Sequence, residues 1–425
     1  MNFLIRPLVA VIGSLVLLSS TLLAADPLSL EEAIRRTAAV HPELRGFTAR
    51  SRLLGLESER SVMPPPLSVG LEIENMLGTG DYSGLAAAET TLTLAGVLER
   101  GGKPAARRAL AATRLDELAV QREVKELDVL AEVARRYLDL AEVQTTLPLL
   151  TAGLERQRSL AAAVRRRFQE GASPEALALS AEAEIARREA ELQRARRGAE
   201  VAWRSLALMW SDNAPGTVPE VIGRARALPE LQSLETLLPS LRQLPDLRSF
   251  VQAERVQDAR RRVAAAGRSF DLEWQLGVRR LEASGDTALV AGVSLPLGTR
   301  SRAALDESIE DVNRELLTSS RDTTLSALET MLVRVHGDIA AALDVIRALE
   351  SEILPRLVKS AAQAERAYAA GALSYFESLQ LQNEVMQVEL EVLALRHDID
   401  RKLVELQRLT GEPIVAGTMQ IGEKK

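Results

Sequence analysis

The chain repeats its own plan at a spacing of roughly 200 residues, and this duplication is the feature that most constrains how it can fold. The run His-Pro-Glu-Leu-Arg-Gly-Phe at residues 41–47 recurs as Leu-Pro-Asp-Leu-Arg-Ser-Phe at residues 244–250. Farther along, Arg-Arg-Phe-Gln-Glu-Gly at residues 166–171 recurs as Arg-Ala-Tyr-Ala-Ala-Gly at residues 366–371. Two matches in the same order and at nearly the same spacing predict two copies of one structural unit.

Each copy is predicted to begin with a helix and to continue with two strands. The helices are expected over residues 29–62 and 233–266, and Ser29 followed by Glu32 fits a capping box. After each helix the apolar residues begin to alternate with polar ones, which is the period of a strand. Four strands are therefore predicted, over residues 67–73, 90–98, 272–279 and 289–297.

A very long helix and a returning helix follow each pair of strands. Apolar residues recur every three or four positions through residues 104–169, and a helix of that length would extend about 100 Å. Gly171 and Gly371 are placed where a positive φ would end a helix and let the chain turn back. Helical hairpins are expected over residues 104–210 and 301–409, so the fold class is mainly α with a small β part. The stripes of Leu, Val and Ala are typical of coiled-coil packing, and an ordinary coiled-coil bundle is the alternative.

The N-terminus is predicted to be a signal peptide spanning residues 1–25. Arg6 precedes a short apolar run over residues 8–18, and small residues lead to Ala25, the expected cleavage point. An uncleaved membrane anchor is the alternative, although the apolar run is shorter than the ~20 residues that span a bilayer. The rest of the chain divides into a first repeat, a second repeat and a C-terminal tail, over residues 26–215, 216–411 and 412–425.

The composition argues against several functional classes. The chain has no cysteine, which excludes disulfides, thiolate metal ligands and a lipidated N-terminal cysteine. Its net charge of -6 is unlike the clustered positive charge that binds nucleic acid. We find no catalytic, cofactor-binding or metal-binding motif, and His336 and His397 are expected to be packed or solvated. Acidic side chains on the long helices are expected to form ion pairs or solvated faces, as at Glu182, Glu184 and Glu189.

The four strands cannot form a stable sheet by themselves. Strands with one apolar and one polar side leave two faces and two edges that need partners. With an export signal and no helix that could span a bilayer, they predict a β-barrel in an outer membrane. A small soluble sheet domain is the alternative.

This order of elements resembles the TolC family of outer-membrane efflux proteins, and the resemblance covers residues 28–411. The helical hairpins of that family turn at an aromatic-x-x-Gly motif, which corresponds here to residues 168–171 and 368–371. The run Glu-Arg-Gly-Gly-Lys at residues 99–103 is similar to the Glu-x-Gly-Gly-Lys junction of the heavy-metal (CzcC-like) branch. The second junction, at residues 292–300, keeps Gly-x-Ser-Leu-Pro-Leu and lacks the Phe-Asp-Arg-Asn run of that branch.

The resemblance implies a homotrimer in which four strands from each copy close a ~12-stranded barrel in the outer membrane, on a periplasmic α-helical barrel. It implies a passive exit duct, not an enzyme, that uses no cofactor and contacts outer-membrane lipid without being lipidated. The implied partners are a periplasmic adaptor (membrane fusion) protein and an inner-membrane pump of the resistance-nodulation-division (RND) class. The CzcC-like junction favours heavy-metal cations as cargo and a role in metal resistance, and leaves drugs or secreted substrates open. The alternative is a periplasmic coiled-coil structural or adaptor protein without a pore, which would not need apolar residues at alternate positions of all four strands.

The resemblance also implies two sites at the far end of the helical hairpins. Glu377 lies where members of the family carry an acidic residue at the periplasmic constriction, and Gln380 occupies the neighbouring place. Three copies of Glu377 around one axis would attract cations, and an ordinary first-turn acid is the alternative. The hairpin turns are expected to dock the adaptor, unless their aromatic rings only pack the tip. The residues expected to dock are Arg166, Phe168, Gly171, Arg366, Tyr368 and Gly371.

Overall fold

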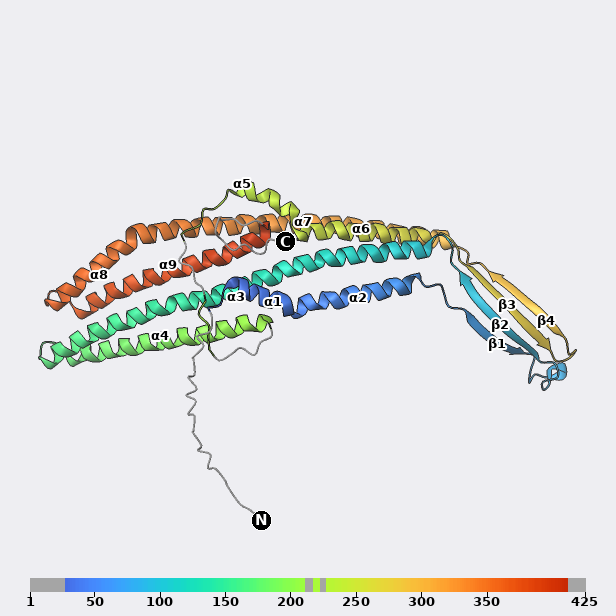
Figure 1. Ribbon diagram of the computed structural model, residues 1–425, viewed down its shortest axis with the longest axis horizontal. Helices are drawn as coiled ribbons and strands as arrows, with labels where there is room; N and C mark the ends of the chain where they lie inside the picture. Colours follow the sequence, from blue (N-terminus) through green and yellow to red (C-terminus); the bar gives the residue numbers. More distant parts are fainter. Residues whose placement is uncertain (1–26, 211–216, 222–226, 412–425) are drawn as a thin grey trace, which may run out of the picture.

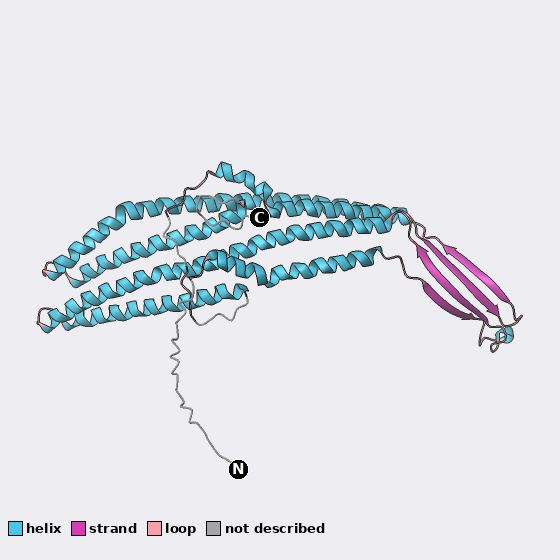
Figure 2. Cartoon of the chain, in the orientation of Figure 1, coloured by secondary structure: helices cyan, strands magenta, loops and turns pink. Residues whose placement is uncertain are grey.

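The computed structural model describes residues 27–210, 217–221 and 227–411. The predicted signal peptide and C-terminal tail lie outside these residues. The described part is elongated, with helices along most of its length and a sheet at one end (Figures 1 and 2). None of the helices in this part of the chain combines the length and the hydropathy of a membrane-spanning segment.

All four predicted strands are present and form one antiparallel sheet. They are ordered as in the sequence: β1 (Ser68–Glu74), β2 (Glu89–Leu98), β3 (Leu272–Leu281) and β4 (Thr287–Ser294). Each copy of the repeat supplies one hairpin, and the pairing of β2 with β3 joins the two copies. Strand β4 ends three residues earlier than expected, because Pro296 has no N–H to donate to the ladder.

The two predicted helical hairpins are confirmed. In the first copy, α3 (Lys103–Gln169) runs away from the sheet and α4 (Glu175–Ala207) returns beside it. In the second copy, the outgoing limb consists of α7 (Thr299–Ala348) and α8 (Leu354–Ala369), and α9 (Tyr375–Thr410) returns. Figure 1 shows both turns at the end of the molecule farthest from the sheet. The chain is therefore mainly helical with a small sheet, as the sequence predicts.

The first helix of each copy is broken where the sequence predicted a continuous helix. The break falls on the residue before a proline, and His41 and Leu244 are extended there, with ψ of 126° and 143°. A proline ring clashes with a preceding residue that is helical. Because both copies have a proline at the same position, both helices break at the same place. The helices on either side of the breaks are α1 (Leu30–Val40), α2 (Pro42–Val62), α5 (Leu234–Leu237) with the 3₁₀ turn Leu238–Gln243, and α6 (Pro245–Ala266).

Ser29 caps α1, but only one of the two hydrogen bonds of the predicted capping box is formed. Its hydroxyl oxygen accepts a hydrogen bond from the backbone N–H of Glu32 at 3.1 Å. The carboxylate of Glu32 instead forms ion pairs with Arg35 and Arg36 in the next turn, on the exposed face of the helix.

The second long helix is interrupted by one π-helical turn, Leu349–Ile353, immediately before α8. Pro355 follows it, and a proline both lacks the N–H of the helical hydrogen bond and crowds the preceding turn. A wider turn relieves that crowding. The very long outgoing helix predicted for the hairpin over residues 301–409 is therefore not one continuous α-helix, whereas α3 continues through Pro148.

Each copy has its own apolar cluster near the middle of the molecule, and the two clusters are equivalent. In the first copy, α1, α3 and α4 pack around buried residues that include Tyr137, Leu140 and Trp203. In the second, α5, α7 and α9 pack around residues that include Ile339 and Leu406. Since corresponding helices build corresponding clusters, the packing supports the predicted duplication.

Candidate functional site

One face of the sheet is apolar across all four strands. The register places Leu71 opposite Leu92, and Leu92 opposite Val278, which itself lies opposite Leu289. Directly opposed residues of an antiparallel pair share a face. These four side chains are 66%, 54%, 45% and 88% exposed, so nothing in the described protomer covers this face. The alternation predicted from the sequence therefore yields a continuous, uncovered apolar surface.

The opposite face of the sheet is polar and carries an ion-pair network. Arg279 of β3 pairs with Glu89 at 2.8 Å and with Glu74 at 3.1 Å, and it donates a hydrogen bond to the hydroxyl of Thr91 at 3.0 Å. Glu74 and Glu89 lie directly opposite each other in the register of β1 and β2. Two opposed carboxylates repel, and the shared guanidinium offsets that repulsion.

Trp274 packs on the apolar face, over a residue with no side chain. A Cβ added at its cross-strand partner Gly96 would lie 2.9 Å from the indole ring, so the ring occupies the space that the glycine leaves. No pattern in the sequence indicated this pairing, because it depends on the register between β2 and β3.

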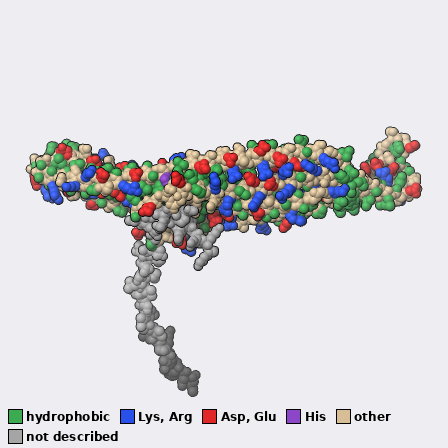
Figure 3. All heavy atoms as spheres, turned by 90° about the horizontal axis from the view of Figure 1, so that it is seen from above, with side chains coloured by type: hydrophobic (Ala, Val, Ile, Leu, Met, Phe, Trp, Pro, Cys, Tyr) green, Lys and Arg blue, Asp and Glu red, His purple; other side chains and the backbone are tan. Residues whose placement is uncertain are grey.

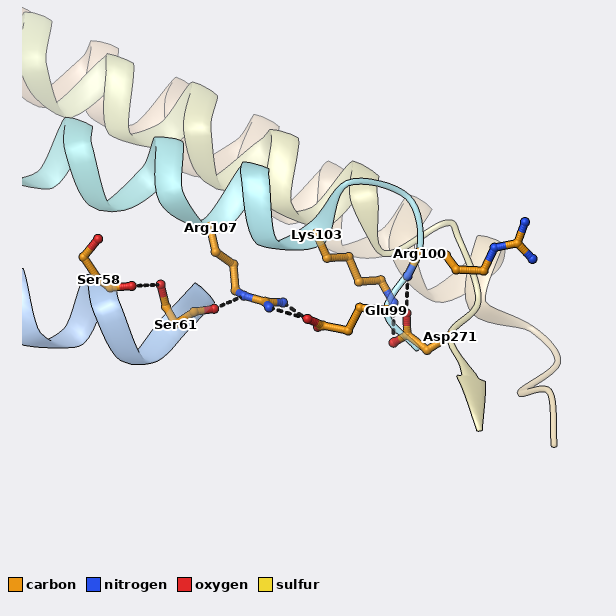
Figure 4. Close-up of polar contacts among 7 residues, drawn as sticks. All are labelled: Ser58, Ser61, Glu99, Arg100, Lys103, Arg107 and Asp271. Carbon is orange, nitrogen blue, oxygen red and sulfur yellow. Dashed lines mark hydrogen bonds and ion pairs between the residues drawn. The ribbon is translucent and has the colours of Figure 1, made fainter. Parts of the chain in front are cut away.

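A group of ion pairs fixes the junction between the sheet and α3 (Figure 4). Arg107 of α3 binds both carboxylate oxygens of Glu99, at 2.8 Å and 2.7 Å, and also donates to the backbone carbonyl of Ser61 at the end of α2. Lys103 pairs with Asp271 at 2.6 Å, just before β3. The end of α2, the start of α3 with the loop before it, and the loop before β3 are three segments far apart in sequence, and they meet here through charged hydrogen bonds.

The carboxylate of Asp271 is held ionised by its neighbours. It accepts hydrogen bonds from the Lys103 ammonium group at 2.6 Å and from the backbone N–H of Arg100 at 3.1 Å. Burial raises the pKa of this carboxyl, but these hydrogen bonds outweigh burial and bring the pKa below its usual value. Ionised Asp271 therefore stabilises the junction fully at pH values above the usual pKa of an aspartate. This stabilisation is lost as the pH falls through the lowered pKa of Asp271.

The glycines of the Glu-Arg-Gly-Gly-Lys run have a physical role at this junction. Gly101 and Gly102 have φ of 75° and 73°, a left-handed conformation in which residues with a Cβ are strained. At Gly101 an added Cβ would also lie 2.4 Å from Ser269. The pair lets the strand turn sharply into α3 while the loop before β3 packs against it.

Both hairpin tips end in the same hydrogen-bonded turn. The N–H of Gly171 donates to the carbonyl of Phe168 at 2.9 Å, and the N–H of Ala172 donates to the carbonyl of Arg167 at 2.8 Å. The second tip repeats both bonds around Gly371, at 3.0 Å and 2.8 Å. This is the Schellman arrangement, and φ at the two glycines is 73° and 78°. The predicted helix ends at both glycines are confirmed.

The two aromatic residues of the tips are not equivalent. Tyr368 is buried in an apolar cluster with Tyr375 of α9 and residues of α3 and α4, whereas Phe168 is 39% exposed. Arg167 joins the tips, because it stacks on the Tyr368 ring at 5.2 Å and donates to the Tyr368 carbonyl at 3.1 Å. Of the two aromatic rings predicted at the tips, only Phe168 is thus presented to solvent.

The arginines and glycines of the predicted tip surface are accessible. Arg166, Arg366, Gly171 and Gly371 are all exposed in the described protomer. The sequence did not indicate Arg167, which makes the contact between the tips, because its repeat counterpart is an alanine.

Glu377 forms a complete capping box at the start of α9. Its carboxylate accepts hydrogen bonds from the Ser374 hydroxyl at 2.6 Å and from the Ser374 backbone N–H at 2.9 Å, and the Ser374 hydroxyl accepts from the Glu377 N–H at 3.3 Å. The hydrogen bonds from the Ser374 hydroxyl and backbone hold the pKa of this exposed carboxyl below its usual value. The Glu377 carboxylate is therefore ionised at neutral pH. It loses its charge, and with it the charged capping hydrogen bonds, only as the pH falls through the lowered pKa.

Gln380 lies one turn farther along α9 and is also exposed. It lines an open groove of about 480 Å³ with a row of neighbours on the same face of the helix: Phe376, Leu379, Asn383, Glu384 and Gln387. Glu377 and Gln380 thus share the exposed surface of the first turns of α9, next to the tip, where the family resemblance implies a constriction.

The side chains expected to be structural have the contacts of structural groups. His397 is buried, and its Nε2 lies 2.7 Å from the hydroxyl of Thr145 on α3. Burial lowers the pKa of His397 and favours the neutral ring. His336 bonds the Gln232 carbonyl at 2.9 Å. The three acidic residues form the ion pairs Glu182–Arg165, Glu184–Arg187 and Glu189–Arg158.

Replacing Gly371 by alanine is expected to destabilise the protein by about 1 kcal/mol, because alanine resists a positive φ. Gly337 is a matched control, since it lies inside α7 and an added Cβ there would meet nothing within 4 Å. Gly337→Ala should stabilise by about 0.5–1 kcal/mol. Thermal unfolding should lower the midpoint for the first variant and raise it for the second; equal midpoints would contradict the turn assignment.

Comparison with known proteins places the fold among outer-membrane channels. The sequence model of the family described as "Outer membrane efflux protein" matches residues 65–211, which lie within the first repeat. No curated protein sequence matches the chain. Solved structures match over nearly the whole length at low sequence identity, and such similarity establishes a shared fold.

Three of the matching structures show how similar the fold is at low sequence identity. A membrane protein from Pseudomonas aeruginosa is 16% identical, with a TM-score of 0.73 and 90% of each chain covered. CusC, whose structures concern folding and transmembrane channel formation, is 15% identical, with a TM-score of 0.71 over 90% of this chain and 91% of that one. The outer membrane protein VceC from Vibrio cholerae is 16% identical, with a TM-score of 0.70 over 90% of this chain and 96% of that one.

Proposed function

We propose that this protein is one of three identical subunits of an outer-membrane exit duct in an efflux system. The observation that carries the proposal is the uncovered apolar face that runs through all four strands of the sheet. In water such a surface would be a liability, whereas in a bilayer it is the surface that contacts lipid. The match to the outer membrane efflux family and the fold shared with channel proteins support the same conclusion.

The polar face of the sheet is suited to line an aqueous lumen. It carries Glu72, Glu74, Glu89 and Glu273 together with Arg279. A lining with more acidic than basic groups favours cations over anions. Together with the Glu-x-Gly-Gly-Lys junction, it supports heavy-metal cations as cargo, although the lining alone would also pass cationic drugs.

The edges of the sheet require further copies of the chain. In the described protomer, β1 and β4 are each paired on one side only. Unpaired backbone groups are not tolerated in lipid, so β4 of one copy pairs with β1 of the next. The two strands run in opposite directions, as antiparallel pairing requires. Three copies give ~12 strands, enough to enclose a wet lumen.

The helical part extends from this barrel toward the inner membrane, with the tips as its docking end. Arg166, Arg366 and Phe168 are the exposed groups that an adaptor would meet there. The duct is passive, so an RND pump drives export through the adaptor.

Membrane fractionation tests the proposal. The protein should stay with outer membranes through high salt and carbonate washes, dissolve only in detergent, and have the mass of a trimer there. A protein that washes off as a monomer would instead be the coiled-coil adaptor without a pore.

Glu377→Gln should reduce the cation preference of the reconstituted channel, because it removes three charges from one ring at the constriction. Gln380→Glu should increase that preference, since it adds a second ring one turn away. Glu175→Gln is the matched control, because Glu175 is the first-turn acid of α4 in the other copy. Reversal potentials in a salt gradient measure the effect, and identical potentials for all three variants would leave Glu377 as a helix cap only.

A further inference from the structure

The apolar face of the sheet ends at a polar row beside the loops that join the paired strands. Across the four strands this row consists of Ile73, Thr90, Arg280 and Thr287. It lies two residues beyond the apolar row that contains Val278, and residues two apart on a strand point to the same face. Apolar side chains thus give way to one cation with a hydroxyl group on either side.

The level of this row follows from the proposed orientation of the sheet. Figure 1 shows the helices at one end of the sheet and the loops between paired strands at the other. With the helices in the periplasm, the loops lie at the outer surface of the membrane. Arg280 is eight residues after Leu272, about 27 Å along a strand and about 20 Å across a membrane at a tilt of ~40°. The apolar band of such barrels is ~25 Å tall, so Arg280 lies at the headgroups of the outer leaflet.

Arg280 differs from its neighbour Arg279 in how its guanidinium is used. Arg279 points to the polar face, where its three partners occupy it. Arg280 points outward and is 52% exposed, and its single contact runs from Nε to the Glu282 carboxylate at 3.3 Å. Its two terminal nitrogens have no hydrogen-bond partner among the described residues. They are the part of a guanidinium that binds phosphate oxygens.

The two threonines add donors to the same place. Thr90 and Thr287 lie directly opposite Arg280, one on each neighbouring strand, where Cβ atoms are about 5 Å apart. Within the described part of the chain, neither hydroxyl makes a hydrogen bond. The row therefore presents a guanidinium and two hydroxyl groups toward lipid headgroups, without an acceptor from the sheet face itself.

We infer that Arg280, with Thr90 and Thr287, binds a phosphate group of the phosphorylated glycolipid of the outer leaflet, at one site in each subunit. The inference rests on the proposed function, because it needs the apolar face to lie in the membrane. An arginine facing lipid is tolerated near the interface and not near the middle of the bilayer, and a phosphate at that level supplies the acceptor that the sheet lacks. Bound there, the lipid would fix the depth of the barrel in the membrane.

Native mass spectrometry of the full-length trimer in detergent tests this site. The probes are lipid A with both phosphates, lipid A from which the phosphates have been removed, and inorganic phosphate. Wild type should bind the phosphorylated lipid at least about tenfold more tightly than the dephosphorylated one, as expected for a charged hydrogen bond. Arg280→Gln should abolish that difference, and Arg280→Lys should keep only part of it, because lysine retains the charge without the fork.

Two further variants separate the site from a general effect of charge. Glu282→Gln should tighten binding of the phosphorylated lipid, since it removes the carboxylate that competes for Arg280. Arg108→Gln should change nothing, because Arg108 is an exposed arginine on α3, outside the sheet, and has no ion-pair partner among the described residues.

The outcomes distinguish this inference from the proposed function. Equal binding of both lipids by wild type, or unchanged binding after Arg280→Gln in a protein that still inserts as a trimer, would overturn the phosphate site and leave the duct intact. Binding of inorganic phosphate that depends on Arg280 in the same way would show a site for the free anion and contradict the assignment to a lipid. A wild-type protein that stays out of membranes altogether would overturn the duct itself.

Discussion

Replacing Leu276 by arginine is expected to prevent assembly in the outer membrane, whereas replacing its neighbour Gln275 by arginine should not. Both side chains are exposed on β3 and point to opposite faces of the sheet. Leu276 lies opposite Leu94 and Ala291 on the apolar face. An arginine facing lipid costs about 2–4 kcal/mol near the middle of the bilayer, and the cost recurs in every copy of the ring.

The Leu276→Arg and Gln275→Arg variants can be compared with wild type after expression in cells and isolation of the outer membranes. Outer-membrane fractions should contain folded trimer for wild type and Gln275→Arg, and little or none for Leu276→Arg. If both arginine variants assemble equally well, the apolar face does not contact lipid. If both fail, the sheet tolerates no charge at this level, and the assignment of its two faces would be contradicted.

Removal of the Arg107 guanidinium should weaken the junction between the sheet and the helices. Arg107→Met keeps much of the side-chain volume but leaves the mostly buried carboxylate of Glu99 and the Ser61 carbonyl without their donor. Charged hydrogen bonds of this kind contribute roughly 1.5–3 kcal/mol each, so a loss of about 2 kcal/mol or more is expected.

Arg108→Met is the matched control for that change. Arg108 is the next residue of α3, is exposed, and forms no ion pair with the described residues. Its replacement should change stability by less than about 0.5 kcal/mol. Denaturant titrations of the detergent-solubilised protein measure both effects, and equal losses would mean that the Glu99–Arg107 pair does not hold the junction.

The order and type of the elements could be predicted because they depend on local signals. Alternation of apolar residues predicted the strands to within a few residues. Gly171 and Gly371 predicted the helix ends, because glycine adopts a positive φ readily. The repeat at residues 41–47 and 244–250 was visible for the same reason. Its proline also breaks both helices, a consequence of X-Pro sterics that the apolar period concealed.

Features that depend on contacts between distant segments could not be predicted. The sequence gives no sign that Arg107 reaches Glu99 and Ser61, or that Asp271 receives Lys103, because these pairs join separate elements. The two tips carry the same motif, yet only the second aromatic ring is buried. That asymmetry arises because Tyr368 packs against Tyr375 and helices of both copies, and burial of this kind follows from tertiary packing.

The capping box of Glu377 illustrates a further limit. A serine followed three residues later by a glutamate predicts a cap, whereas the family resemblance implied a charged constriction at the same residue. The structure places the carboxylate on Ser374 in a single protomer, and a cap can still face an axis shared by three copies. A charged constriction predicts that Glu377→Gln changes ion selectivity, whereas a helix cap alone predicts no change. Local sequence patterns do not distinguish these two roles.

Conductance of the purified protein in planar lipid bilayers tests the central claim most directly. Trimers extracted from outer membranes should produce discrete, ohmic current steps, with cations preferred over anions in a salt gradient. The Leu276→Arg protein, which cannot place its sheet in lipid, should produce none under the same conditions. Insertion of wild-type protein without any current step, or steps of the same size from Leu276→Arg, would contradict the assignment of this chain as an outer-membrane duct.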